Sequence, residues 1–112
     1  AVITALSISG QATGRFCFEG FLSTAKKSRK EHLESLKNEK RTMIFYESPY
    51  RLVKTLTQFS EYFGPDRQVS VCREISKIHE ESVRGTLAEV IAHFTTTEPR
   101  GEIVIILSGK ED

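Results

Sequence analysis

Acidic and basic side chains stand where a strand pattern gives way to a helix pattern, in the segment Tyr46-Glu47-Ser48-Pro49-Tyr50-Arg51. Such a crossing places backbone amides and side chains at the end of a sheet, where ligand clefts form. A purely structural interpretation also exists, because Ser48-Pro49 caps a helix whatever the function and Glu47 with Arg51 would form a surface ion pair of small value. The residues alone leave both interpretations open.

A second concentration of charge follows the next strand pattern, in Arg73-Glu74-Ile75-Ser76-Lys77-Ile78-His79-Glu80-Glu81 and then Arg84-Gly85. Charges of both signs could orient a polar substrate. The same run could equally be a solvated loop with internal ion pairs. Because residues 74–85 hold almost no core-forming side chains, we predict a polar loop there.

A compact basic cluster consists of Lys26, Lys27, Arg29 and Lys30. It could contact phosphates, where each neutralised charge adds salt-dependent affinity. The alternative is a solvated helix start, although the positive end of the helix dipole does not favour cations there. Both interpretations stay open.

Residue combinations that mark a metal or redox centre are weak. His79-Glu80-Glu81 places possible ligands side by side, but adjacent residues on a strand point to opposite faces, so we predict no metal site. Cys17 and Cys72 are widely separated in apolar alternating stretches, which favours buried reduced thiols over a disulfide. The sequence lacks a Gly-rich phosphate loop and the Cys-x-x-Cys, His-Glu-x-x-His and Gly-x-Ser-x-Gly motifs.

Length and composition bound the class of protein. With 112 residues, 38% hydrophobic and 28% charged, the chain fits one soluble globular domain. The formal net charge of +1 gives no global attraction to nucleic acid, so any RNA contact needs a local patch. No apolar run could span a bilayer and no secretory leader is recognisable, so we expect a cytoplasmic protein with no membrane partner.

The elements that must position these residues begin with a helical pattern in residues 1–9 that has no capping residue ahead of it, which suggests a piece of a longer protein. Phe16–Leu22 then reads as a strand, with Gly20 as a bulge or a point of close ligand approach.

Ser28 and Glu31 have the spacing of a capping box, which predicts a helix ending near Lys40, and Thr42–Tyr46 is strand-like. Ser48-Pro49 then starts the best-defined helix, which Gly64-Pro65 ends. Its apolar residues recur with helical spacing at Leu52, Leu56, Phe59 and Phe63.

The last third predicts a strand over Gln68–Arg73 and a helix that a capping box of Thr86 and Glu89 begins. The run Ile103–Leu107 is apolar on both faces, as in a central strand. Alternating elements predict an α/β fold with flanking helices, and we expect a mixed sheet.

The whole chain resembles the C-terminal half of the ribosomal RNA small-subunit methyltransferase I family, within the tetrapyrrole (corrin/porphyrin) methylase superfamily. Single motifs are weak, but their order and spacing together are specific. The motifs that carry the resemblance are Ala5-Leu6-Ser7-Ile8-Ser9-Gly10, Arg15-Phe16, Phe18-Glu19-Gly20-Phe21-Leu22, Arg41-Thr42, Phe45-Tyr46-Glu47-Ser48-Pro49-Tyr50-Arg51, Gly64-Pro65-Asp66-Arg67, Arg73-Glu74-Ile75-Ser76-Lys77, His79-Glu80-Glu81, Arg84-Gly85-Thr86-Leu87 and Arg100-Gly101-Glu102-Ile103-Val104.

The resemblance implies the second domain of the tetrapyrrole methylase fold, with the first domain absent and S-adenosylmethionine in a cleft between the two. It implies methylation of a cytidine ribose 2′-hydroxyl in small-subunit ribosomal RNA, by a protein that is a homodimer at full length. This chain alone should be inactive. The cofactor positions that it implies are Ala5, Leu6, Tyr46, Glu47, Arg100, Gly101 and Glu102.

A ribose hydroxyl is a poor nucleophile, so a base is required beside the bound substrate. Our candidates for this base are Glu47, Glu74, Lys77 and Glu80. The residues that we expect to contact RNA are Lys26, Lys27, Arg29, Lys30, Arg51, Arg73 and Arg84.

Two other functions stay open: methylation of a corrin or porphyrin ring, and a non-catalytic RNA-binding or dimerisation module. The Tyr-Glu-Ser-Pro and His-Glu-Glu motifs argue against ring methylation. Ser23 and the following Thr24-Ala25 depart from the family pattern, which usually has proline, basic residues and glycine there.

Overall fold

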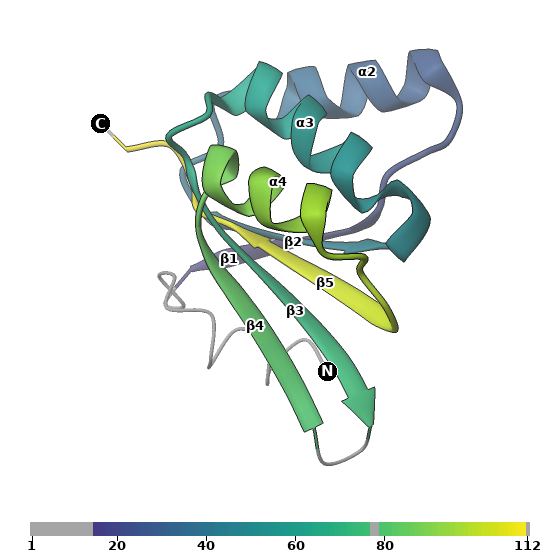
Figure 1. Ribbon diagram of the computed structural model, residues 1–112. Helices are drawn as coiled ribbons and strands as arrows, with labels where there is room; N and C mark the ends of the chain where they lie inside the picture. The colour runs from purple at the N-terminus through teal and green to yellow at the C-terminus, as the bar shows by residue number, and fades with distance from the viewer. Residues whose placement is uncertain (1–14, 77–78, 112) are drawn as a thin grey trace.

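A computed structural model describes residues 15–76 and 79–111, and for residues 74–76, 79 and 80 it describes the backbone alone (Figure 1). Its sheet has five strands in the order β1-β2-β5-β3-β4. The strands are β1 (Phe16–Phe21), β2 (Thr42–Glu47), β3 (Gln68–Ser76), β4 (His79–Thr86) and β5 (Glu102–Leu107). β1 and β2 run parallel and the other neighbours are antiparallel, so the predicted mixed sheet is confirmed.

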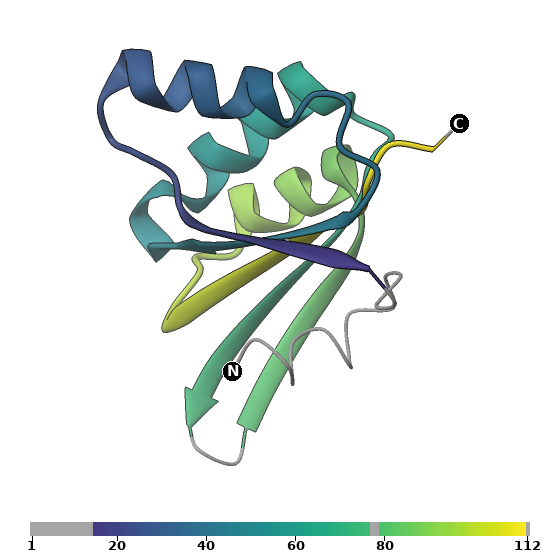
Figure 2. The same cartoon turned by 180° about the vertical axis from the view of Figure 1, so that it is seen from behind.

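Helices cover one face of this sheet, as the two opposite views show (Figures 1 and 2). They are α2 (Lys26–Ser35), the short 3₁₀ helix η1 (Pro49–Arg51), α3 (Leu52–Phe63) and α4 (Leu87–Thr96). The main hydrophobic core includes side chains of all three α-helices and of β2, β3 and β5. Removing these apolar surfaces from water contributes most of the stabilisation that holds the two layers together.

The predicted helix of residues 48–63 is confirmed. Leu52, Leu56, Phe59 and Phe63 are all buried against the sheet. Gly64 ends the helix with φ of 94°, a conformation that costs glycine little. Ser48 precedes Pro49 as predicted, but its side chain makes no capping hydrogen bond and the first turn is 3₁₀.

The prediction of a central strand at Ile103–Leu107 is also confirmed. β5 lies between β2 and β3. Ile103, Ile105 and Leu107 join the core beneath the helices, whereas Val104 and Ile106 belong to a smaller buried cluster on the other face. Because successive side chains alternate, a strand buried on both faces must be apolar throughout.

The polar loop predicted over residues 74–85 is wrong. β3 and β4 form an antiparallel hairpin, with Val71 opposite Val83 and Arg73 opposite Glu81. The far end of the hairpin extends beyond the helical layer (Figure 1). Strands outside that layer are held by the backbone ladder and bury little, so their sequence carries no apolar alternation.

The capping box predicted at Ser28 and Glu31 is wrong as well. α2 begins at Lys26 with Ala25 as its N-cap residue and no side-chain cap, so Ser28 lies inside the first turn. It ends at Ser35 rather than near Lys40. The buried residues of this helix are Arg29 and Leu33, four positions apart, so packing of this face rather than a cap sets the helix.

The capping box at Thr86 and Glu89 is confirmed. The Thr86 hydroxyl oxygen accepts from the Glu89 backbone N–H at 3.2 Å, and a Glu89 carboxylate oxygen accepts from the Thr86 N–H at 2.9 Å. Two donors at the start of α4 that the helix itself cannot pair are thereby satisfied.

Cys72 is buried as predicted, whereas Cys17 is only half-buried. Burial and the neighbouring Glu19 raise the pKa of the Cys17 thiol to about 11. Throughout the part of the chain that the structure describes, no helix is both long and apolar enough to cross a membrane.

The bulge predicted at Gly20 is present, since the β1–β2 register shifts between Phe18 and Gly20 and Gly20 has φ of 69°. The shift leaves Phe18 and Phe21 both packed against the ring of Tyr46, with centroids 5.3 and 5.4 Å away. These two phenylalanines are 53% and 66% exposed, so edge strand β1 presents aromatic rings to the surroundings.

Candidate functional site

Two of the segments expected to form a site meet at one end of the sheet. β2 and β5 are antiparallel neighbours, and Glu47 pairs with Ile103. The end of β2 therefore lies beside the start of β5. The expected cofactor positions Tyr46, Glu47 and Glu102 fall within about two residues of this pairing.

The half of the β3–β4 hairpin nearer its turn joins the same end of the sheet. Arg73 also pairs with Ile103, and Glu74 pairs with Glu102 on one side and Glu80 on the other. Glu47, Ile103 and Arg73 thus form one row of paired residues across the sheet. Glu102, Glu74 and Glu80 form the next row, and neighbouring strands lie about 4.8 Å apart. The topology thus brings Glu47, Glu74 and Glu80 to one end of the molecule although they are far apart in sequence.

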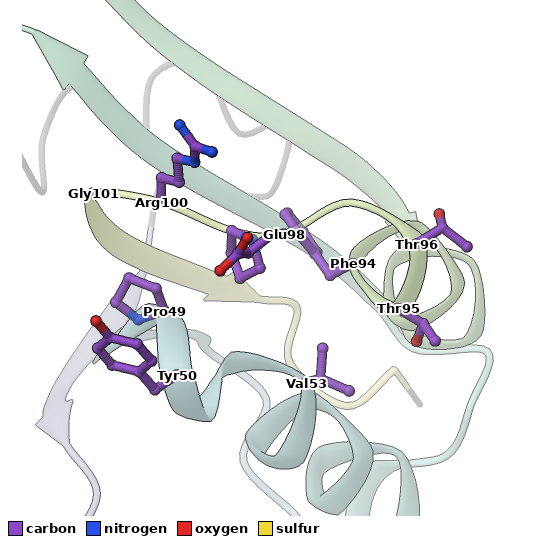
Figure 3. Close-up of a pocket in the computed structure, with 10 residues that line it drawn as sticks. Pro49, Tyr50, Val53, Phe94, Thr95, Thr96, Glu98, Arg100 and Gly101 are labelled. Carbon is purple, nitrogen blue, oxygen red and sulfur yellow. The ribbon is translucent and has the colours of Figure 1, made fainter.

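A pocket of about 680 Å³ lies at this end, between the helices and the start of β5 (Figure 3). One side is the first turn leading into α3 and the other is the end of α4 with its connection to β5. We call it the strand-end pocket; it is lined by Pro49, Tyr50, Val53, Phe94, Thr95, Thr96, Glu98, Pro99, Arg100 and Gly101.

The local sequence explains this geometry. Pro49 fixes φ for the first turn after β2, and Gly101, at φ of 79°, allows the backbone to turn into β5. Tyr50 is 97% exposed, so its ring lies at the open edge of the pocket. Arg100 and Gly101, two of the expected cofactor positions, line the pocket directly.

Tyr46 lies elsewhere. Its side chain packs on the face of the sheet away from the helices, against Phe18, Phe21 and the smaller buried cluster. Only its backbone is near the strand end. Ala5, Leu6 and Lys77 lie outside the described residues.

Glu47 is buried beneath the pocket wall, at 6% exposure. One carboxylate oxygen accepts from the Ser48 N–H at 2.8 Å, and the other accepts from the Thr55 hydroxyl at 2.5 Å. Arg51 stands 3.7 Å from the first oxygen. Because the carboxylate is buried, the proposed surface ion pair is exposed on the arginine side only, where 45% of the Arg51 side chain is accessible.

Arg29 completes a chain of hydrogen bonds that links α2 to the end of β2. Its Nη2 donates to the Thr55 hydroxyl oxygen at 2.7 Å and its Nε to the Gln58 amide oxygen at 2.6 Å. We call the set Arg29, Gln58, Thr55, Glu47 and Ser48 the Arg29–Glu47 network. Burial lowers the pKa of the Arg29 guanidinium, and the nearby Glu47 carboxylate acts in the opposite direction.

The basic cluster is consequently split. Lys26, Lys27 and Lys30 are exposed, whereas Arg29 is only 8% exposed and bonded inward. Because Arg29 contacts Thr55 near the start of α3, the first turns of the two helices lie side by side, at the pocket end of the molecule. The three lysines therefore stand on the same end as the strand-end pocket.

The remaining basic residues of the expected RNA surface lie on the hairpin. Arg73 forms an ion pair with Glu81 across the strands, its Nε donating at 2.7 Å. Arg84 is exposed on β4. Internal pairing, one of the two interpretations of this charged segment, thus holds for Arg73.

Sequence reasoning missed Thr55, Gln58 and most of the pocket lining. Both Thr55 and Gln58 lie on α3, whose apolar periodicity predicts a helix but says nothing about its polar residues. Thr55 is the one polar residue on the buried face of α3, and this was the signal that could have found it. Within residues 15–76 and 79–111, no three His, Cys, Asp or Glu side chains gather to hold a metal ion.

The family model for Tetrapyrrole (Corrin/Porphyrin) Methylases matches residues 1–91. Ribosomal RNA small subunit methyltransferase I of Synechocystis is 49% identical over 109 residues, which cover 97% of this chain and 39% of that protein. The protein of the same name from Thermotoga maritima is 46% identical over 99% of this chain and 49% of its own length. The chain thus spans less than half the length of these curated relatives.

Solved structures show the same fold. The methyltransferase CobJ superposes with a TM-score of 0.72 at 17% identity, covering 97% of this chain and 47% of that one. Cobalt precorrin-4 methyltransferase CbiF gives 0.69 at 18% identity, covering 96% and 48%. Because the family model matches most of this chain and the relatives are nearly half identical to it, the chain belongs to the tetrapyrrole (corrin/porphyrin) methylase family.

Proposed function

We propose that this chain is the second domain of an S-adenosylmethionine-dependent methyltransferase that modifies a ribose 2′-hydroxyl of a cytidine in small-subunit ribosomal RNA. The similarity of the whole chain to ribosomal RNA small subunit methyltransferase I, at 49% identity, carries the proposal. The convergence of the expected site residues at one sheet end supports it.

The residues of the strand-end pocket fit part of such a cofactor. Its volume of about 680 Å³ is of the order that small-molecule sites have. Pro49, Val53 and Phe94 offer apolar surface for a fused aromatic ring, while Thr95 and Thr96 offer hydroxyls for polar groups. Arg100 and Gly101, with the backbone of Tyr46, Glu47 and Glu102 and residues Ala5 and Leu6, are our proposed cofactor positions.

When bound, S-adenosylmethionine supplies an electrophilic methyl group on a sulfonium. What this chain contributes is positioning, because transfer needs the acceptor oxygen in line with the methyl carbon. The relatives are more than twice as long as this chain. We propose that a first domain in their additional length forms the other wall of the cleft. This chain alone is proposed to be inactive.

The base that takes the hydroxyl proton is proposed among Glu47, Glu74, Lys77 and Glu80. Both carboxylate oxygens of Glu47 already accept hydrogen bonds in a buried setting, which favours a holding role for it. Glu74 pairs with Glu102 at the start of β5 and Glu80 pairs with Glu74, and these two are our preferred candidates. The exposed Lys26, Lys27 and Lys30, with Arg51, Arg73 and Arg84, would contact RNA phosphates.

The test uses the protein from the full reading frame, with labelled S-adenosylmethionine and unmodified small ribosomal subunits. We expect methyl incorporation into a cytidine ribose, and a loss of roughly 100-fold or more when the base is replaced, by Glu74→Gln or Glu80→Gln. Glu61→Gln, an exposed glutamate on α3, is the matched control. Methylation of a porphyrin-type ring instead of RNA, or RNA binding without methyl transfer, would contradict the proposal.

A dimer of the full-length protein stays a prediction. It rests on the family resemblance alone, and the proposed chemistry does not depend on it. Light scattering of the full-length protein would measure it directly.

A further inference from the structure

The Arg29–Glu47 network is a buried polar chain in a domain whose core is otherwise almost wholly apolar. Arg29, Thr55 and Glu47 are 8%, 1% and 6% exposed. Burying charged groups is costly unless they are paired and hydrogen-bonded. A buried polar chain of this kind therefore suggests that it holds neighbouring parts of the backbone in place.

The direction of the hydrogen bonds is fixed by the chemistry of the groups. A guanidinium can only donate and a carboxylate can only accept, so the Thr55 hydroxyl must accept from Arg29 and donate to Glu47. The distances of 2.7 and 2.5 Å agree with charge-assisted bonds. The Thr55 hydroxyl thus bridges the Arg29 guanidinium on α2 and the Glu47 carboxylate at the end of β2.

The far end of the chain acts on the pocket wall. The other oxygen of Glu47 accepts from the Ser48 N–H at 2.8 Å, and Ser48 directly precedes Pro49. Pro49, Tyr50 and Val53 are the pocket residues contributed by this turn and the start of α3. Figure 3 shows them facing the α4–β5 connection across the pocket.

We propose that Arg29, through Thr55, is a positioning residue that locks the Glu47–Pro49 turn and so fixes one wall of the strand-end pocket for cofactor binding. The proposal rests on the proposed function for the identity of the cofactor. It removes Arg29 from the RNA-contacting surface and gives it an internal role.

The decisive comparison uses Thr55 in the full-length protein. Thr55→Val keeps the shape of the side chain but removes its hydroxyl, whereas Thr55→Ser keeps the hydroxyl that bridges Arg29 and Glu47. We expect Thr55→Val to raise the Kd for S-adenosylmethionine, measured by calorimetry, roughly tenfold, and Thr55→Ser to stay near the unmodified protein. Thr57→Val is the matched control, since the Thr57 hydroxyl donates only to the Val53 carbonyl of the same helix.

A second measurement does not depend on the cofactor. Hydrogen exchange of peptides covering residues 46–53 should become faster in Thr55→Val and in Arg29→Met, with peptides of β5 unchanged. Gln58→Met, which removes the acceptor of the Arg29 Nε–H, should give a smaller change in the same peptides and keeps the test valid if Arg29→Met does not fold.

If the unmodified protein binds no S-adenosylmethionine, the proposed function fails while the exchange measurement still decides the positioning role. Equal exchange in residues 46–53 for Thr55→Val and Thr55→Ser would overturn the inference. So would a Kd unchanged in Thr55→Val alongside a lower melting temperature, because the network would then only stabilise the fold.

Discussion

At the scale of single residues, Gly109 shows how little space the chain leaves where its end folds back. A Cβ atom at this position would lie 1.9 Å from the carbonyl oxygen of Lys40. The backbone there is held by the Lys110 N–H, which donates to the Glu39 carbonyl at 2.7 Å. The neighbour is backbone and cannot rotate away as a side chain could.

We therefore expect Gly109→Ala to lower the free energy of unfolding by about 3 kcal/mol or more, through overpacking against fixed atoms. Gly85→Ala is the control, because the three atoms nearest to its Cβ all belong to the Glu89 side chain, and the nearest, a carboxylate oxygen of the capping box at 3.2 Å, needs to move by only a few tenths of an ångström. Urea unfolding would measure both. Equal losses in the two variants would show that the segment after β5 can shift.

At the scale of elements, the capping box makes the stability of α4 depend on pH. Hydrogen bonds from the Thr86 backbone lower the pKa of Glu89 below its ordinary value. A carboxylate with a lowered folded pKa adds stability above its unfolded pKa, and this stability is lost as the pH falls through the folded pKa.

Glu89→Gln should therefore be less stable than the unmodified protein at neutral pH, and the gap should close below about pH 4. Thermal unfolding at a series of pH values from about 2.5 to about 7 would measure it. Glu61→Gln controls for loss of a negative charge on a helix. A gap that stays constant with pH would mean that the carboxylate contributes no charge-dependent capping.

The sequence predicted those elements whose side chains meet the core. α3 and β5 were predictable because burial on one face or on both imposes apolar periodicity on residues such as Leu56, Phe59 and Ile105. The β3–β4 hairpin was not, since much of it extends beyond the helices and leaves no such signal (Figure 1). The start of α2 was misplaced because tertiary packing of Leu33 outweighed a local cap.

The candidate site divides in the same way. The strand-to-helix segment at Glu47 could be located from turn chemistry alone. The burial of Arg29 could not, because its partner Thr55 is 26 residues away and only the packed helices bring the two together. Side chains that hold a site through long-range contacts leave no local pattern.

At the scale of the whole molecule, stability is concentrated between the helices and the middle strands. Phe59 is fully buried and packs on Phe45 at 4.8 Å between ring centroids. Phe21, on edge strand β1, is 66% exposed. A comparison of these two phenylalanines therefore contrasts a residue of the core with a residue at the exposed edge of the sheet.

We expect Phe59→Ala to cost about 3–5 kcal/mol of unfolding free energy, because it leaves a cavity in the core. Phe21→Ala should cost less than about 1 kcal/mol by itself. Denaturant titration of both variants makes the comparison. A similar loss from Phe21→Ala would show that the ring on β1 is covered in the native protein.

The bulge in β1 also determines which side chains of the strand share a face of the sheet. The pleat has a period of two, so side chains three positions apart on a regular strand lie on opposite faces. The additional residue at the bulge lets Phe18 and Phe21 both pack on Tyr46. Removing Glu19 would therefore leave a regular ladder in which Gly20 still pairs with Phe45 and Phe21 with Tyr46, so no later side chain would change face. What Glu19 contributes is its own side chain, whose carboxylate oxygen lies 2.8 Å from a ring nitrogen of His32 on α2 and so ties the edge strand to the helical layer.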